Sequence, residues 1–178
     1  MRRVWARAHW DAILKFAGAC RPATWPWKKR RSKIQGWGVF TTQPITKNTR
    51  IIDYAGEKIP NRESLRRETR YLKAGHIWCF KLNRLYARDA AVGGNVARFI
   101  NHSCQPNCYT QVVGDTIWIR AARNIRRGEE LTYDYCTDGV GSIQCRCRPG
   151  CKVMGNQGNT AASKDRIASA DLVCADSI

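Results

Sequence analysis

The sequence has no long hydrophobic run: nothing in its 178 residues approaches the roughly 20 consecutive apolar residues that a membrane-spanning helix requires. It also lacks internal repeats, alternating strand–helix–strand units and a glycine-rich phosphate-binding loop. These absences argue against an integral membrane protein, a repeat array and a Rossmann-type fold. The composition, 43% hydrophobic and 25% charged, is typical of a globular protein. We expect a single domain with short extensions, monomeric and without a membrane partner.

Acidic residues are also scarce: 14 Asp and Glu stand against 31 Lys and Arg, which gives a net charge of +17. A field of this sign attracts polyanions, above all nucleic acid, and repels basic partners at long range. Part of the excess lies in residues 1–33, where the basic residues face only Asp11. The remainder of the chain stays positive without that stretch. We therefore expect contact with DNA or RNA, with the basic N-terminal arm as the first candidate surface.

The chain divides into four parts. Residues 1–33 form a basic, Trp-rich extension, with an amphipathic helix expected over 5–17 and an extended basic linker over 25–33. Residues 34–136 form the domain itself, and residues 137–152 form a cysteine-rich segment. From residue 153 onward the chain is rich in Gly, Ala, Ser and Asn and is expected to be a flexible tail.

Short strands and tight turns dominate the central part. Runs rich in β-branched and aromatic residues predict strands over 50–54, 76–82, 85–89, 108–113, 116–122 and 130–135. Gly114-Asp115 is a two-residue hairpin signal between two of them. Asn61 is expected to cap a helix that ends near Leu72, and a short helical segment follows Gly93-Gly94. The predicted fold class is mainly β with short helices (α+β).

Three strings carry most of the functional information: Gly36-Trp37-Gly38-Val39-Phe40, then Arg98-Phe99-Ile100-Asn101-His102-Ser103-Cys104, and finally Glu130-Leu131-Thr132-Tyr133-Asp134-Tyr135. In this order they resemble the SET-domain family of protein lysine methyltransferases, and the resemblance covers about residues 31–152. It implies a fold of small sheets around a knot-like core. In that core, residues 98–104 lie beside residues 131–135.

The resemblance implies S-adenosyl-L-methionine as methyl donor. Glycines at positions 36 and 38 allow close approach of the backbone to a ligand, although the same pattern alone would more often be a plain hairpin turn. Asn101 is implied to bind the cofactor through its side-chain amide and His102 through backbone groups. Trp78 stands where the family places an aromatic residue, and core packing explains it almost as well. The implied cofactor site comprises Gly36, Trp37, Gly38, Trp78, Asn101 and His102.

The same resemblance implies a narrow aromatic channel for the substrate lysine. Tyr54 and Phe80 are candidates for its walls, and Tyr133 and Tyr135 are the candidate catalytic residues. Free lysine has a pKa of about 10.4, so under about 1% of it is neutral at pH 7 to 8. Desolvation in the channel and the positive sulfur of the cofactor both favour the neutral amine. Tyr135 is implied to orient that amine, and Tyr133 to leave less room for methylated products, so we expect mono- or dimethylation.

Nine cysteines, an odd number with uneven spacing, favour a metal site in a reducing compartment over a disulfide framework. Cys145, Cys147 and Cys151 crowd together as metal ligands do. The family's post-SET segment implies one structural zinc ion, with Cys104 as the fourth ligand. Its last two cysteines are usually four residues apart with a Gly where Arg148 stands, whereas three residues intervene here. Cys108 is either a substitute ligand or a buried thiol.

Three functions remain open at this point. The first is an active methyltransferase acting on a lysine of a histone or another protein bound to nucleic acid. The second is a catalytically silent SET-like zinc module that binds nucleic acid through its basic surface, and the third is an effector delivered to host chromatin. Tyr135, Asn101 and His102 are all present and favour the first. Use of S-adenosylmethionine predicts an intracellular site: the cytoplasm in bacteria, and the nucleus or chromatin in a eukaryote or a host cell.

Overall fold

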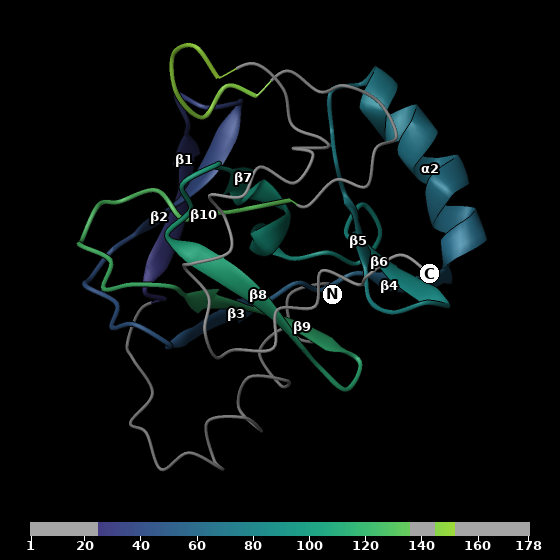
Figure 1. The fold of residues 1–178 in the computed structure, drawn as a ribbon, viewed down its shortest axis with the longest axis horizontal. Coiled ribbons are helices and arrows are strands. Elements are labelled where there is room, and N and C mark those ends of the chain that lie inside the picture. Colours follow the sequence, from purple (N-terminus) through teal and green to yellow (C-terminus); the bar gives the residue numbers. More distant parts are fainter. Residues whose placement is uncertain (1–24, 136–144, 152–178) are drawn as a thin grey trace, which may run out of the picture.

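The structure of the chain is a computed structural model, and it describes residues 25–135 and 145–151. Within these ranges the chain forms ten short strands, one α-helix and one turn of 3-10 helix, and the strands build four small sheets (Figure 1). The prediction of a mainly β protein with short helices is confirmed. The helix expected over 5–17 and the tail from 153 lie outside the described residues.

The largest contribution to the core comes from a three-stranded antiparallel sheet in the order β3-β9-β8. The predicted hairpin is present, and Gly114 in its two-residue turn has a φ of +56°, the sign that such turns require. Ile117, Trp118 and Ile119 are all buried in the central strand, because both faces of this sheet are covered. The strands are β3 (Arg50–Asp53), β8 (Cys108–Val113) and β9 (Thr116–Ala121).

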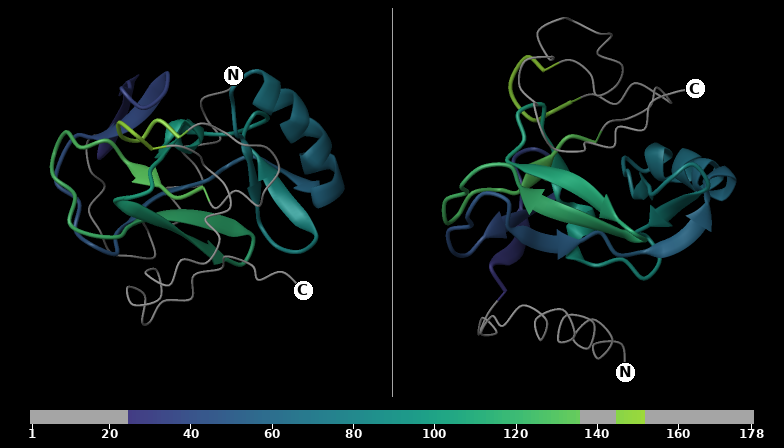
Figure 2. Two further views of the ribbon diagram at one scale, coloured as in Figure 1. Left: turned by 45° about the horizontal axis from the view of Figure 1, so that its top comes forward. Right: turned by 60° about the horizontal axis from the view of Figure 1, so that its bottom comes forward.

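A second antiparallel sheet, in the order β4-β6-β5, supports the helix α2 (Asn61–Lys73). Figures 1 and 2 place α2 and this sheet on one side of the molecule and the β1–β2 pair on the other. The expected capping role of Asn61 is wrong. Pro60 occupies the capping position, while the Asn61 side chain donates to two loop carbonyls. The strands are β4 (Glu57–Pro60), β5 (Cys79–Lys81) and β6 (Tyr86–Asp89).

A buried carboxylate holds α2 to its sheet. Asp89 at the end of β6 is 0% exposed and accepts hydrogen bonds from Arg67 at 2.8 Å and from the Tyr71 hydroxyl at 2.9 Å. Burial and the hydrogen bond to Asp89 raise the pKa of Tyr71 to about 12. The charge of Asp89 is therefore paired inside the protein, which is the condition for burying a carboxylate without a large penalty. This cluster fixes α2 against β6.

The basic segment before the first motif is a strand rather than a linker. Residues Trp27–Arg31 form β1, which pairs in antiparallel register with β2 (Trp37–Thr41). The expectation of a linker over 25–33 is therefore wrong, although the extended backbone was expected. The four residues after Trp27 are exposed, so β1 shows no alternation of apolar and polar residues from which a strand could be recognised. The domain boundary at residue 34 stays a prediction.

The two most informative strings meet in a short parallel pair. β7 (Asn101–His102) lies beside β10 (Thr132–Tyr133), with Thr132 opposite Asn101 and Tyr133 opposite His102. The amide of Ser103 extends the pairing by donating to the carbonyl of Tyr133 at 3.1 Å. The expected approach of residues 98–104 to residues 131–135 is confirmed. The helical segment before β7 is a single 3-10 turn, η1 (Val96–Phe99).

The core lies between the three-stranded sheet, the β1–β2 pair and the β7–β10 pair. Its largest fully buried apolar side chains are Val39, Ile52, Ile100, Ile117, Ile119, Ile125 and Leu131. In the part of the chain that the structure describes, no helix has the length and apolar character needed to span a membrane.

Candidate active site

Four aromatic residues from separate elements form a continuous row. Tyr54 follows β3 and lies 5.3 Å from Phe80 of β5, measured between ring centroids. Phe80 lies 5.9 Å from Tyr133 of β10, and Tyr133 lies 4.8 Å from Tyr135. Tyr54 and Tyr133 are buried, and Phe80 and Tyr135 are partly buried against the core. The structure thus brings together all four residues predicted for the channel and for catalysis.

Two of these tyrosines direct their hydroxyl protons at backbone carbonyls. The Tyr135 hydroxyl donates to the carbonyl of Ile100 at 2.7 Å, and the Tyr54 hydroxyl donates to the carbonyl of Trp78 at 3.0 Å. Burial raises the pKa of both hydroxyls well above 10. Both tyrosines therefore remain neutral at physiological pH. Since the proton of Tyr135 is engaged by Ile100, the lone pairs of its oxygen are left for an incoming hydrogen-bond donor.

A partly buried network ties the glycine-containing turn to β7. The side-chain amide of Asn101 donates to the carbonyl of Trp37 at 3.0 Å and to the Glu130 carboxylate at 2.8 Å. Ser32 donates to the other oxygen of Glu130 at 2.9 Å. A Cβ at position 38 would collide with this carboxylate, so a larger residue there would require Glu130 to shift out of the network. The turn is therefore held by Glu130 and Asn101 together, and contact of these residues with a cofactor stays a prediction.

The imidazole of His102 connects two parts of the site. Its Nδ1 accepts from the amide of Tyr135 at 3.2 Å, and its Nε2 lies 3.2 Å from the sulfur of Cys104. The ring also meets the Tyr135 ring edge-on, with 5.5 Å between centroids. Burial lowers the pKa of His102, while the Asp134 carboxylate, 3.5 Å from Nδ1, acts in the opposite direction.

An aromatic and cationic group surrounds Trp78, just before β5. His76 stacks on its ring with 4.3 Å between centroids, and the guanidinium of Arg98 lies 5.7 Å from the same ring. The Arg98 side chain donates to the carbonyl of Ala90 at 3.2 Å. Within the described residues, however, its Nε–H is buried and has no hydrogen-bond partner. A buried donor without a partner costs stability.

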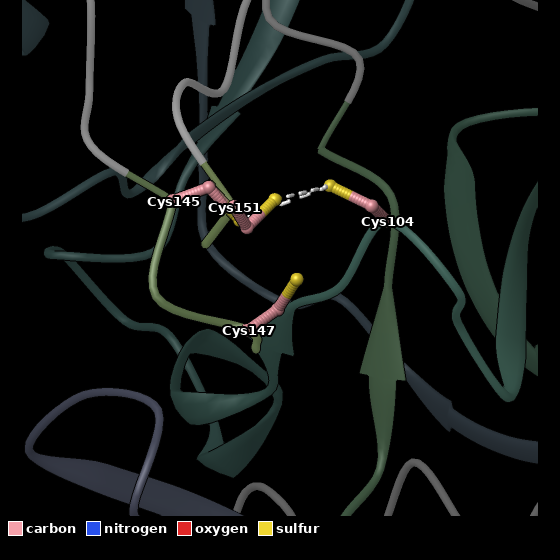
Figure 3. Close-up of side chains that lie close together, drawn as sticks. All are labelled: Cys104, Cys145, Cys147 and Cys151. Carbon is pink, nitrogen blue, oxygen red and sulfur yellow. Dashed lines mark hydrogen bonds between the residues drawn. The ribbon is translucent and has the colours of Figure 1, made fainter. Parts of the chain in front are cut away.

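Four cysteine sulfurs converge beside this site. The Sγ atoms of Cys104, Cys145, Cys147 and Cys151 all lie within 4.8 Å of one another (Figure 3). Cys104 lies 3.8 Å from Cys145 and 3.5 Å from Cys151. A tetrahedral zinc ion with Zn–S bonds of about 2.3 Å places its sulfurs about 3.8 Å apart. The four thiols therefore have the number and the spacing of a zinc site.

The shortened cysteine spacing closes through a tight turn. Gly150 has a φ of +77°, and the amide of Cys151 donates to the carbonyl of Arg148 at 3.3 Å. This turn returns Cys151 to the cluster within three residues. Cys108 does not belong to the cluster: it is 1% exposed and donates to the side chain of Asn107 at 3.4 Å. Of the two readings of Cys108, the buried thiol is correct.

Comparison with known proteins decides the family. A family model described as "SET domain" matches residues 36–136, which is more than half of the chain. The chain belongs to the SET-domain family. It is 44% identical over 131 residues to "Histone-lysine N-methyltransferase trr" of Drosophila melanogaster, and 41% identical over 138 residues to "Histone-lysine N-methyltransferase, H3 lysine-4 specific" of Emericella nidulans. It is also 42% identical over 125 residues to "Histone-lysine N-methyltransferase 2D" of Homo sapiens.

These relatives are far larger than this SET domain. The matches cover 68%, 71% and 66% of the present chain but 5%, 11% and 2% of the three relatives. The likeness therefore concerns one domain of each relative.

Three residues of this SET domain had not been singled out from the sequence. Glu130 and Ser32 hold the glycine-containing turn, and Arg98 carries the buried donor beside Trp78. Arg98 and Glu130 lie inside the strings that resemble the family, so their place in the sequence could have marked them as residues of the site. Ser32 precedes the motif by four residues, and nothing in its sequence context marks it.

Proposed function

We propose that this chain is a protein lysine methyltransferase that uses S-adenosyl-L-methionine. The observation that carries the proposal is the buried aromatic row that ends at Tyr135, whose hydroxyl proton is engaged by Ile100. It is supported by membership of the SET-domain family and by relatives named as histone-lysine N-methyltransferases. When bound, the cofactor supplies a methyl group on positively charged sulfur, which a neutral amine can displace.

The residues around the turn and Trp78 suit such a cofactor. The exposed backbone of the turn at Gly36 suits a ligand that approaches closely. Trp78 offers a flat aromatic face. Asn101 is proposed to support cofactor binding in two ways: it holds the turn in place through the carbonyl of Trp37, and its side-chain amide contacts the cofactor. His102 is proposed to contribute backbone groups, as the family resemblance implies.

The aromatic row prepares the substrate amine. Tyr54 and Tyr133 are buried, so an amine that enters beside them loses water and its ammonium form is disfavoured. The Tyr135 oxygen, with its own proton directed at Ile100, accepts a hydrogen bond from the amine and orients the nitrogen lone pair. These residues bind, orient and exclude water, and no separate general base is required.

The hydroxyl of Tyr133 is proposed to limit the degree of methylation. Its ring lies 4.8 Å from that of Tyr135, and we propose that its oxygen takes up space that a bulkier methylated amine would need. We therefore expect mono- and dimethyl-lysine as the main products. Mass spectrometry of the products of the pure protein tests this, and trimethyl-lysine as the dominant product would contradict it.

The four clustered cysteines are proposed to hold one structural zinc ion. Zinc would supply a tetrahedral link between Cys104, next to β7, and the segment 145–151. We propose domain limits of 34–136 for the SET domain and 137–152 for the zinc segment. Residues 1–33 are the proposed basic extension, of which Trp27–Arg31 pair with the domain as β1, and residues 153–178 are the proposed tail.

The proposed substrate is a protein bound to nucleic acid, such as a histone. Of the 31 basic and 14 acidic residues of the chain, 23 and 9 lie in the described part, which leaves most of the positive charge on the folded domain. Lys28, Lys29, Arg30 and Arg31 are exposed on β1. A surface of this sign is attracted to DNA or RNA and repelled by an isolated basic peptide. In a eukaryotic cell this points to chromatin as the place of action.

Transfer of labelled methyl groups from S-adenosylmethionine into a protein lysate tests the function. The wild-type chain is compared with Tyr135→Phe, each before and after nuclease treatment. Labelled bands that disappear with Tyr135→Phe establish the methyltransferase, and bands lost after nuclease treatment support recruitment by nucleic acid. Absence of both label and cofactor binding would instead favour a silent SET-like zinc module that binds nucleic acid.

A further inference from the structure

The side chain of His102 uses both of its ring nitrogens. Nδ1 lies 3.2 Å from the amide nitrogen of Tyr135, and Nε2 lies 3.2 Å from the sulfur of Cys104. The residue is 7% exposed and belongs to β7. One imidazole therefore spans the distance between the cysteine cluster and the proposed catalytic tyrosine.

The partners determine which nitrogen carries the proton. A backbone amide can only donate, so Nδ1 must accept and carries no proton. In the neutral ring the proton is then on Nε2, and the Cys104 sulfur, 3.2 Å away, is placed to accept it. A metal-bound cysteine is a thiolate, which accepts such a bond more strongly than a neutral thiol does. The Asp134 carboxylate would favour a proton on Nδ1. It lies 3.5 Å from this atom, farther than the Tyr135 amide does, and it is 58% exposed to solvent, so the amide has the stronger claim on Nδ1.

The bond to His102 matters because of where Tyr135 lies in the chain. The parallel pairing of β10 with β7 ends at Tyr133, and Tyr135 lies two residues further on. The hydrogen bond from its amide to His102 continues the attachment of this segment to β7 beyond the last paired residue. The Tyr135 side chain is held separately, through its hydroxyl and the carbonyl of Ile100. The imidazole thus sets the backbone position from which that hydroxyl is aimed.

We propose that His102 is a positioning residue that couples the occupancy of the four-cysteine cluster to the placement of Tyr135. With metal bound, the Cys104 thiolate holds the imidazole through Nε2, and Nδ1 in turn holds the Tyr135 amide. Without metal, Cys104 no longer fixes the ring, and the backbone at Tyr135 loosens. This inference rests on the proposed function for its meaning in catalysis, but the coupling itself can be measured without turnover.

Two substitutions separate the two bonds. The Oδ1 of His102→Asn stands near the position of Nδ1 and keeps an acceptor for the Tyr135 amide, but the shorter side chain cannot reach Cys104. The Nε2 of His102→Gln stands near the position of the imidazole Nε2 and keeps a donor for Cys104, but it leaves no acceptor for the amide. The chain has six tyrosines, so selective 15N-tyrosine labelling gives a spectrum in which the Tyr135 amide can be followed by hydrogen exchange.

Three proteins are compared with zinc and after chelation. In the wild type, chelation is expected to speed exchange of the Tyr135 amide at least about tenfold. The Tyr54 amide, which donates to the carbonyl of Ile117 at 2.7 Å, should be unchanged and serves as the control for unfolding. His102→Gln should leave the Tyr135 amide unprotected in both states while binding zinc normally. His102→Asn should keep the amide protected in both states and bind zinc roughly tenfold or more weakly, as outer-shell changes commonly do.

Tyr135 exchange that does not respond to zinc in the wild type, or that still responds in His102→Gln, would overturn the proposal. If chelation also exposes the Tyr54 amide, the domain has unfolded, and only the zinc-loaded proteins are compared. In these, the proposal predicts that the Tyr135 amide exchanges fast in His102→Gln and stays protected in His102→Asn. Protection in His102→Gln and fast exchange in His102→Asn would refute it. Turnover is a separate readout, for which His102→Gln should lower kcat at least about tenfold with little change in KM for the cofactor. A protein that shows the exchange pattern but transfers no methyl would refute the proposed function and leave the coupling intact.

Discussion

Replacement of Tyr135 by phenylalanine removes one hydroxyl, which we expect to serve both the stability of the fold and the methyl transfer. In the folded protein that hydroxyl donates to the carbonyl of Ile100 at 2.7 Å, and Ile100 is 0% exposed. A buried carbonyl left without its partner costs about 1–3 kcal/mol of stability. For a domain of this size, about 1 kcal/mol lowers Tm by about 4 °C, so we expect a loss of about 4–12 °C. Loss of a positioned hydrogen-bonding group should also lower kcat by about 100- to 1,000-fold.

Tyr54→Phe is the matched control for this prediction. It removes the same atom from the same row, and the lost hydroxyl also donates to a backbone carbonyl, that of Trp78 at 3.0 Å. Its loss of Tm should therefore be similar, while its loss of kcat should be much smaller, because Tyr54 lies at the other end of the row. Differential scanning calorimetry and single-turnover methyl transfer measure the two quantities. An equal fall in kcat for both variants, or less than a tenfold fall for Tyr135→Phe, would refute the assigned role of Tyr135.

Three further results are expected. Glu130→Ala should weaken cofactor binding in calorimetry at least about tenfold because Asn101 loses its side-chain acceptor. Glu130→Gln keeps an acceptor oxygen and should bind nearly normally. Equal affinity of Glu130→Ala and wild type would show that Glu130 does not hold the turn in its binding conformation. Tyr133→Phe should shift the products toward trimethyl-lysine in mass spectrometry, and an unchanged distribution would contradict a steric limit at this position. Burial raises the pKa of Cys79 to about 12, so at pH 8 its alkylation should be at least about 100-fold slower than that of a free thiol with a pKa of about 8.5. Chelation of zinc should speed the alkylation of Cys147, which is only partly buried, but not that of Cys79. Rapid labelling of Cys79 would show that its thiol is not buried as the structure has it.

The active-site strings could be located from the sequence because each concentrates unusual residue types in a fixed order. The hairpin at Gly114 was also predictable, since a two-residue turn demands a positive φ and glycine adopts it without strain. Strand β1 could not be predicted: Lys28 and the three basic residues after it carry no apolar alternation, and their pairing with β2 is made by backbone groups. The capping role expected of Asn61 failed for a related reason, because its side chain found loop carbonyls that only the folded chain places nearby.

The sequence alone was enough to predict the family, the four aromatic residues of the row, the four cysteines and the excess of positive charge. These are properties of residue type and order, and they do not depend on how the chain packs. The tertiary structure decided which partners those residues find. It placed Glu130 under the turn, Arg98 with an unused donor beside Trp78, and His102 between Cys104 and Tyr135. Hydrogen bonds act over about 3 Å, so partners 29 to 98 residues apart in the chain become definable only once the fold has brought them together.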